Sequence, residues 1–326
     1  MKIAVLDDRK NEDINNQSLN RIDEYHDDVN EAISQALRAL GHNVYLLEAN
    51  INLERRLSVI RPDLVFNNSI KQINGGEKAY GPSILEKLRI PFTGSSSSVC
   101  ADAYDKVKAK KIFIRKNINT PNFYEIPNAL NKIPVDIKFP LLLKPVFGGC
   151  SRGIGKENLI RKKNTYMRKI KKIIDKSPIR YFVEEFIGGR EFTISVIGNL
   201  KNLKVLPIME FIYPNEDEMM HYRDFKTKMI DYEKEKYICP ATLSKPKQFQ
   251  LTNLAIKTYQ AIGCRDYARI DIRLDKEGKP YVLELNVLPN LIPNQSSFAI
   301  TAEAGGLSFT QLISTIIFVA KKRLNL

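Results

Sequence analysis

The first 90 or so residues alternate between short apolar runs and segments whose apolar side chains recur at helical spacing. Residues 2–6 form the first run, and helical spacing then extends from Val29 to Leu40 before Gly41 ends it. This alternation predicts a parallel sheet covered by helices, and so an α/β fold, in a first domain at residues 1–94. The further elements expected there are strands at 43–47 and 63–67 and helices near 53–60 and 83–88.

The pattern changes after Gly94. A chain of 326 residues exceeds the usual size of one hydrophobic core, so more than one domain is expected. A polar link at 95–98 opens a predicted α+β lobe at 95–187, and residues 188–326 predict a second one with antiparallel strands. The first lobe's expected elements are a helix at about 101–116, strands at 141–144 and 180–185 and a helix at 161–176; the second lobe's are strands at 192–197, 203–207, 268–274 and 281–285, a helix at about 246–261 and a last helix begun by Ser308.

The formal net charge of +14 attracts polyanions, and eight Lys and Arg residues fall within residues 161–176. The apolar residues of that segment, Met167, Ile170, Ile173 and Ile174, predict one buried helix stripe with the lysines on its wet face. A solvated helix face is favoured over a nucleic-acid patch, because no recognised nucleic-acid motif accompanies the charge.

Cysteine and histidine positions argue against a zinc centre or a disulfide framework, since the 4 cysteines form no Cys-x-x-Cys pair and the 3 histidines are scattered. Asp7 and Asp8 interrupt the N-terminal apolar run, and Lys321 cuts off the run at 316–320. Neither a signal-peptide core nor a membrane span is expected. The sequence therefore predicts a cytoplasmic protein with no membrane partner.

Two polar motifs, Arg269-Ile-Asp271 and Glu284-Leu-Asn286, lie on predicted strands. Alternate residues of a strand share a face, so each pair points together and the two strands bring oxygen ligands to one place. Two carboxylates and an amide oxygen suit Mg²⁺ ions that also hold nucleotide phosphates. The alternative is a sheet whose charges simply alternate outward, and alternation alone favours it.

Two further segments suggest contacts with a nucleotide. Lys144 ends a predicted strand, and the glycine-rich turn at 148–153 can wrap phosphates with its N–H groups, although a plain hairpin turn explains it as well. Residues 182–191 form an acidic link between the two lobes that offers backbone groups and carboxylates to adenine and ribose. An exposed acidic connector is the alternative there.

In this order the segments resemble the D-alanine-D-alanine ligase branch of the ATP-grasp superfamily, over nearly the whole chain. The resemblance implies an N-terminal Rossmann-like pre-ATP-grasp domain at 1–94, a small ATP-grasp lobe at 95–187 and a large lobe at 188–326 that carries the metal and substrate sites. The two lobes would clamp the nucleotide. The motifs that carry the resemblance are 90–94, Asp105-Lys106 with Lys110, the Lys144 loop, 184–191, Lys228, 239–241, 269–271, 284–286 and 303–308.

The resemblance also implies an ATP site. The loop at 148–153 would close over the phosphates, Glu184 would accept from the adenine amine and Glu191 would hold the ribose. Lys228 is similar to the lysine that steadies the transferred phosphate. The implied ATP-binding residues are Lys106, Lys144, Gly149, Cys150, Ser151, Glu184, Glu185, Phe186, Ile187, Glu191 and Lys228.

For the metal and substrates, the resemblance implies two Mg²⁺ ions, or Mn²⁺, held by Asp271, Glu284 and Asn286, with Glu284 shared. Arg269 matches the arginine that stabilises the developing oxyanion, and Ser296 the serine that receives the second substrate's carboxylate. The substrates would be amino acids, and a homodimer through the first domain is implied. The catalytic candidates are Arg269, Lys228 and Ser151, and the substrate-binding candidates are Glu77, Arg269, Asn290 and Ser296.

The chain departs from the family pattern around the first substrate. The family usually has a glycine-rich loop that contains a glutamate after the first strand, and this chain has residues 7–16 there instead. Cys150 stands where a serine is usual, and Met229 stands where a tyrosine is usual. Asn290 replaces a glycine after Pro289. These changes predict a rebuilt first-substrate pocket.

The predicted function is therefore an ATP-dependent carboxylate–amine ligase that forms a peptide or amide bond through an acyl-phosphate, with a first substrate other than D-alanine. The alternative is a true D-alanine-D-alanine ligase with a divergent loop. A third class, a nucleotide- or nucleic-acid-binding protein without catalysis, is disfavoured because the chain retains Arg269, Asp271, Glu284 and Asn286 together.

Overall fold

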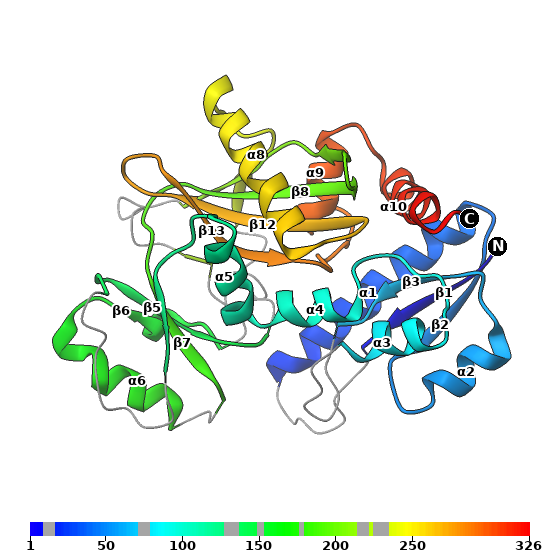
Figure 1. The fold of residues 1–326 in the computed structure, drawn as a ribbon, viewed down its shortest axis with the longest axis horizontal. Coiled ribbons are helices and arrows are strands. Elements are labelled where there is room, and N and C mark those ends of the chain that lie inside the picture. Colours follow the sequence, from blue (N-terminus) through cyan, green and yellow to red (C-terminus); the bar gives the residue numbers. More distant parts are fainter. Residues whose placement is uncertain are drawn as a thin grey trace.

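The computed structural model describes residues 1–8, 17–70, 79–126, 137–148, 153–175, 179–213, 222–223 and 235–326. Figure 1 shows a first domain at one end, a small lobe around α6 at the other and a larger sheet between them, with both chain ends at the first domain. Several predicted site residues lie outside the described residues: Glu77, Gly149, Cys150, Ser151 and Lys228, together with Met229 and residues 9–16 of the divergent loop.

The first domain confirms the predicted alternation. Its strands are parallel and lie in the order β2-β1-β3. The central strand β1 is buried on both faces, as is typical of a parallel sheet covered by helices. The elements are β1 (Lys2–Asp7), α1 (Gln17–Ala39), β2 (Asn43–Glu48), α2 (Leu53–Ile60), β3 (Leu64–Asn68) and α3 (Tyr80–Lys87).

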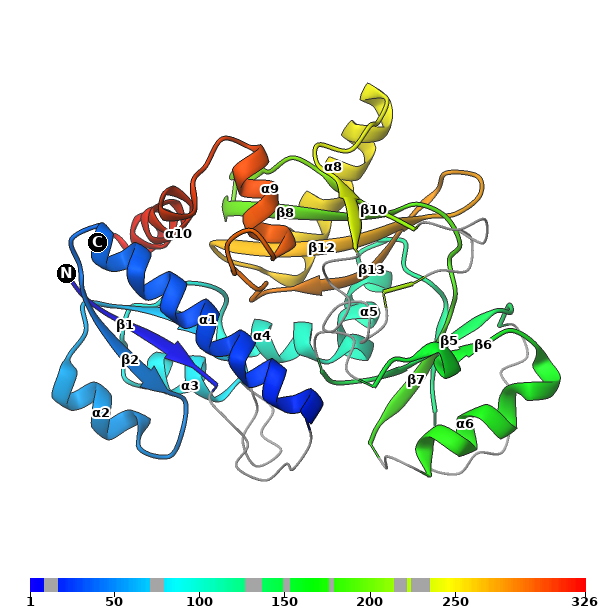
Figure 2. The same ribbon diagram turned by 180° about the vertical axis from the view of Figure 1, so that it is seen from behind.

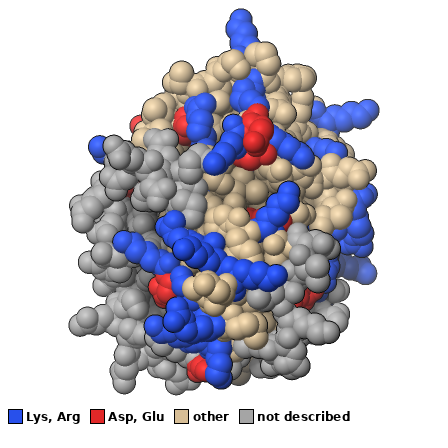
Figure 3. Space-filling model, turned by 90° about the vertical axis from the view of Figure 1, so that its left-hand side faces the viewer, with Lys and Arg blue, Asp and Glu red and all other residues tan. Residues whose placement is uncertain are grey.

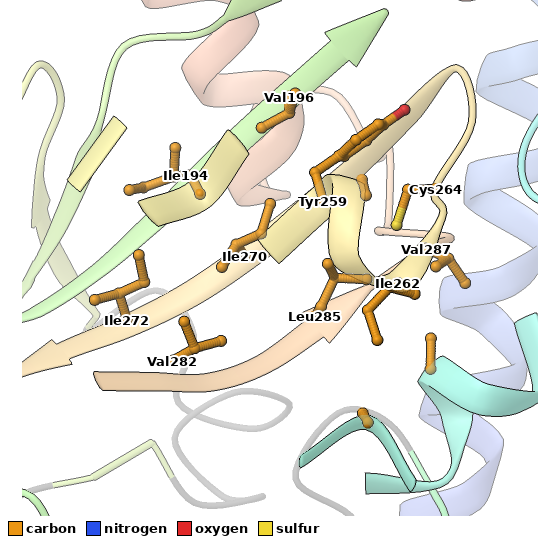
Figure 4. Close-up of a cluster of buried hydrophobic side chains, with 14 of the residues drawn as sticks. Ile194, Val196, Tyr259, Ile262, Cys264, Ile270, Ile272, Val282, Leu285 and Val287 are labelled. Atoms are coloured by element: carbon orange, nitrogen blue, oxygen red, sulfur yellow. The ribbon is translucent and has the colours of Figure 1, made fainter. Parts of the chain in front are cut away.

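The central sheet is antiparallel, as predicted, with strand order β11-β10-β8-β12-β13 and with β9 paired to β8 (Figure 2). Helix α8 covers one face, where Tyr259 and Ile262 pack against strand residues such as Ile270 and Leu285 (Figure 4). The other face packs Tyr267 and Ile197 against Phe298 of the later helix at residues 297–304, and carries the polar side chains of Arg269, Asp271 and Arg273 farther along the sheet. The elements are β8 (Glu191–Asn199), β9 (Asn202–Val205), β10 (Met209–Ile212), β11 (Lys236–Ile238), α8 (Lys245–Ile262), β12 (Tyr267–Leu274) and β13 (Pro280–Asn286).

The single helix predicted at 101–116 is wrong, because two helices, α4 (Ser97–Tyr104) and α5 (Lys106–Arg115), meet at Asp105. The Asp105 carboxylate accepts a hydrogen bond from the Lys108 amide at 2.9 Å, so a residue that favours N-caps starts a second helix. Both helices pack into the core of the central sheet, through Cys100 and Phe113 among others. Helices α4 and α5 therefore pack with the central sheet, whereas the predicted lobe at 95–187 includes them in the small lobe.

The small lobe is a separate antiparallel sheet, in the order β4-β7-β5-β6, with its own hydrophobic core under α6. The basic helix is shorter than predicted, and its buried positions are Tyr166 and Ile170, whereas Met167 is 37% exposed. Tyr166, Ile170, Ile173 and Ile174 follow the spacing i, i+4, i+7 and i+8, so the buried stripe keeps the three predicted isoleucines and takes Tyr166 in place of Met167. Basic side chains of this end of the molecule face solvent (Figure 3). The elements are β4 (Phe123–Glu125), β5 (Leu141–Pro145), β6 (Leu159–Ile160), α6 (Tyr166–Ile174) and β7 (Tyr181–Glu185).

The last two helices, α9 (Ser297–Ala304) and α10 (Phe309–Leu324), join the first domain to the central sheet. As predicted, Ser308 begins α10, where its hydroxyl accepts from the Gln311 amide in a capping box. Helix α10 shares one core with α1 and β1 (Figure 2). Arg323 of α10 pairs with the buried carboxylate of Asp266, which also accepts from the Gly94 amide at 2.7 Å.

In the part of the chain that the structure describes, no single helix is long and apolar enough to cross a membrane, and only α9 and α10 taken together, bent by 98°, reach that length and composition.

Candidate active site

A cleft lies between the small lobe and the polar face of the central sheet and encloses about 750 Å³ of free space, part of it open to solvent. This is within the usual size of a small-molecule site. It brings together residues from six separate parts of the chain. The lining residues include nine of those expected from the sequence, Lys106, Lys144, Glu184, Glu185, Phe186, Ile187, Glu191, Asp271 and Glu284.

The candidate metal ligands lie opposite each other on β12 and β13. Asp271 pairs with Glu284, and Arg269 pairs with Asn286, so all four share one face of the sheet. A β-bulge interrupts the pairing at Leu283, because Ile272 then pairs with Val282. The extra residue lets Leu283 and Glu284 both line the cleft while β13 still packs its apolar side chains into the core.

The Asp271 carboxylate is held by two neighbours. Arg269 donates Nε to Oδ1 and Nη2 to Oδ2, both at 2.9 Å, and the Thr193 hydroxyl donates to Oδ1 at 2.6 Å. The Asn286 amide contacts Glu284 Oε1 at 3.4 Å. Among the described residues no group of three His, Cys, Asp or Glu side chains is arranged for a metal ion. Two carboxylates with an amide oxygen fit Mg²⁺, and the expected magnesium site at Asp271, Glu284 and Asn286 stays a prediction.

Two lysines flank the buried carboxylate of Glu184 at the back of the cleft. Lys144 Nζ lies 2.5 Å from Oε1 and Lys110 Nζ lies 2.7 Å from Oε2. Burial favours a higher pKa for Glu184, but the two ammonium groups outweigh it and hold the pKa below its usual value. The expected contact of Glu184 with adenine stays a prediction, and in this structure both carboxylate oxygens face lysines.

Glu191, the candidate ribose ligand, is held by two residues. Its Oε2 accepts from the Tyr213 hydroxyl at 2.7 Å and forms an ion pair with Arg273 Nε at 3.1 Å. Arg273 also donates to the Ile187 carbonyl at 3.0 Å, and its guanidinium lies 4.9 Å from the Phe186 ring centre. Burial, followed by the charge of Glu191, raises the pKa of Tyr213 well above its ordinary value.

Sequence reasoning missed the roles of Lys110 and Arg273. Both are charged residues buried at 1% and 2% exposure. The signals were present, since Lys110 lies in the apolar stripe of α5 with Val107 and Arg273 follows Asp271 by two residues on the same strand face.

The remaining described candidates are engaged locally. Lys106 contacts the Gly148 carbonyl at the start of the glycine loop. Ser296 caps α9 by accepting from the Ala299 amide at 3.3 Å, and Asn290 Oδ1 accepts from the Ile292 amide at 2.7 Å. The expected substrate contacts of Ser296 and Asn290 stay predictions.

The divergent loop begins at the carboxyl end of β1 with two buried acids. Asp7 accepts from the Asn30 amide group at 2.6 Å. Asp8 accepts from the Ser69 hydroxyl at 2.5 Å and from the Ile70 amide at 2.6 Å. These carboxylates therefore fasten β1 to α1 and to the segment after β3.

Comparison with known families identifies the chain. The family model described as the C-terminus of D-ala D-ala ligase matches residues 112–318, more than half of the chain. The chain belongs to the D-ala D-ala ligase family. The predicted ATP-grasp branch is confirmed, and with it the enzyme class, an ATP-dependent ligase that joins a carboxylate to an amine.

Relatives of this D-ala D-ala ligase family member cover nearly its full length. A D-alanine–D-alanine ligase of Carboxydothermus hydrogenoformans is 32% identical, over 89% of this chain and 91% of that protein. An uncharacterized protein, y4sG, of Sinorhizobium fredii is 30% identical, over 90% of this chain and 87% of that protein. The crystal structure of D-alanine–D-alanine ligase from Bacillus anthracis complexed with ATP shares the fold, with a TM-score of 0.76 at 21% identity and coverage of 100% and 99%.

Proposed function

We propose that this enzyme joins two D-alanine molecules with ATP as the energy source. The observation that carries the proposal is the cleft, in which Lys144, Asp271 and Glu284 face one space between two lobes. The substrate comes from the relatives, of which several that are 28–32% identical carry the name D-alanine–D-alanine ligase. The expectation of a different first substrate is not confirmed, and these relatives favour the alternative.

The proposed reaction has two steps. The carboxylate of the first D-alanine attacks the terminal phosphorus of ATP, which forms an acyl-phosphate and releases ADP. The amine of the second D-alanine then attacks the acyl carbon, loses a proton and expels phosphate. Phosphorylation is needed because a free carboxylate has no adequate leaving group.

The chain's own residues have separate tasks in this proposal. Lys106 and Lys144 bind the ATP phosphates, and the segment with Phe186 and Ile187 binds adenine. Arg269 stabilises negative charge that develops in the transition state. Asp271, Glu284 and Asn286 would hold Mg²⁺, which supplies positive charge to the phosphates when bound.

A second candidate function keeps the chemistry and changes the first substrate. The observation that favours it is the pair Asp7 and Asp8 at the end of β1, where the family usually has glycines. Since both acids have protein partners in this structure, they contribute to the frame of the pocket. A cytoplasmic homodimer and the solvated role of the basic α6 face remain proposals from the sequence.

The test is ADP release with D-alanine as the only amino acid, compared with L-alanine and with a panel of other amino acids at equal concentration. Glu284→Gln serves as the control for contaminating ATPase. We expect turnover with D-alanine alone and a D-alanyl-D-alanine product by mass spectrometry. Turnover that needs another amino acid would refute the proposal and establish the second candidate.

A further inference from the structure

Lys110 is a buried ionic residue to which the proposed chemistry assigns no task. It lies on α5 behind the cleft wall, and its side chain is 1% exposed. Its ammonium contacts Glu184 Oε2 at 2.7 Å and donates to the Thr120 hydroxyl at 2.7 Å. Burying a lysine is costly unless it is paired, and an apolar residue would fill this helix position without that cost.

The charges around the cleft suggest what Lys110 does. Among the described residues, five carboxylates and four cationic side chains line the cleft, so its wall is net negative toward an anionic nucleotide. Glu184 also faces Lys144 at 2.5 Å, and taken alone these two charges cancel. With Lys110 included, the three buried groups carry a net positive charge. Because they are almost fully buried, dissolved salt screens them little.

The network also has a fixed geometry. The Thr120 hydroxyl, which accepts from Lys110, donates in turn to the Val282 carbonyl on β13 at 2.8 Å. Lys144 lies on β5 and Glu184 on β7 of the small lobe. A single chain of contacts therefore runs from the phosphate-facing lysine to the strand that carries Glu284 and Asn286.

We propose that Lys110 is a positioning residue that neutralises Glu184, so that the charge of Lys144 is available to the phosphates of ATP. This inference rests on the proposed function, because it assumes that ATP occupies the cleft. In this arrangement Glu184 holds the Lys144 ammonium in place without cancelling its positive charge. Loss of the Lys110 charge weakens nucleotide binding even though Lys110 itself does not line the cleft.

The test uses calorimetry to measure the dissociation constant of a non-hydrolysable ATP analogue in the presence of Mg²⁺ and without any amino acid. Lys110→Met removes the charge and keeps most of the volume, and should weaken binding by about tenfold. Lys110→Arg keeps the charge and should bind nearly as the unchanged enzyme does. The double variant Lys110→Met with Glu184→Gln should recover most of the lost affinity, because Lys144 is again uncompensated.

The double variant separates charge balance from simple structural damage. Equal affinity of Lys110→Met and the unchanged enzyme would overturn the inference, and so would a double variant as weak as Lys110→Met. If Lys110→Met does not fold, by circular dichroism and thermal melting, Lys110→Gln compared with Lys110→Arg gives the same contrast. Failure of the unchanged enzyme to bind the analogue would instead contradict the proposed function.

Discussion

Replacing Arg269 by alanine is expected to lower the stability of the enzyme and to slow its chemistry, for two separable reasons. The Arg269–Asp271 pair is bidentate, and the two side chains are 14% and 7% exposed. Removing one partner of a buried pair costs about 3–5 kcal/mol, because the other charge stays buried. The Thr193 hydroxyl still donates to Asp271, so we expect a loss near the lower figure.

This loss should be visible by differential scanning calorimetry. A change of about 3 kcal/mol corresponds to a fall in melting temperature of roughly 6–12 °C for a cooperative unit of 150–250 residues. Addition of Mg²⁺ with a non-hydrolysable nucleotide should shrink the difference from the unchanged enzyme, because a cation beside Asp271 replaces the missing guanidinium. Arg269→Lys keeps the charge without the planar fork and should show a smaller loss.

Turnover gives the second readout. In the ADP-release assay, Arg269→Ala should lower kcat about a hundredfold or more, as expected for a residue that acts on the transition state. It should not weaken nucleotide binding, since a ligand that stabilises the variant more than the unchanged enzyme must bind the variant at least as tightly. Normal kcat with weakened nucleotide affinity would show that Arg269 is a binding residue. An equal stability loss with and without Mg²⁺-nucleotide would refute the metal site at Asp271.

Three further predictions concern the metal ligands, acid stability and the domain junction. Glu284→Gln should reduce kcat more than Asn286→Asp, because the first change removes a charge and the second keeps an oxygen ligand; equal losses in the ADP-release assay would contradict the shared role of Glu284. The pKa of Glu184 is lowered in the folded state, so the contribution of its carboxylate to stability is present above the unfolded pKa of about 4.3 and is lost as pH falls through the folded pKa. The free energy of unfolding measured with urea between pH 5 and 3 should therefore depend less on pH in Glu184→Gln than in the unchanged enzyme. An equal dependence in the two proteins would contradict the lowered pKa. Arg323→Met leaves the buried Asp266 carboxylate without its cation and should cost about 3 kcal/mol in urea unfolding, whereas a loss below 1 kcal/mol would show that the Gly94 and Asn199 contacts suffice.

Local sequence patterns predict most of the fold, whereas the full set of expected cleft residues came from the family resemblance. Because side chains alternate along a strand, Arg269 shares a face with Asp271, and Glu284 shares a face with Asn286. The structure pairs the two strands so that Asp271 lies opposite Glu284 and Arg269 lies opposite Asn286. The cap at Ser308 likewise depends on residues close in sequence.

Features decided by distant contacts could not be predicted in this way. The bulge at Leu283 exists because β13 packs its apolar side chains on α8 while it follows β12. The burial of Lys110 and Arg273 depends on carboxylates that lie 74 and 82 residues away along the chain, Glu184 and Glu191. The break at Asp105 was readable from its N-cap preference, but helical periodicity continues across it.

The shared core of α1, β1 and α10 has a consequence for synthesis of the protein. Ile33 and Leu37 of α1 are covered by a helix that begins at Phe309, so the ribosome completes the first domain's sequence long before it makes the covering helix. At about 5–20 residues per second the interval is roughly 10–40 s. During that time the apolar stripe of α1 is open to a chaperone, and the first domain reaches its final packing only when translation is almost finished.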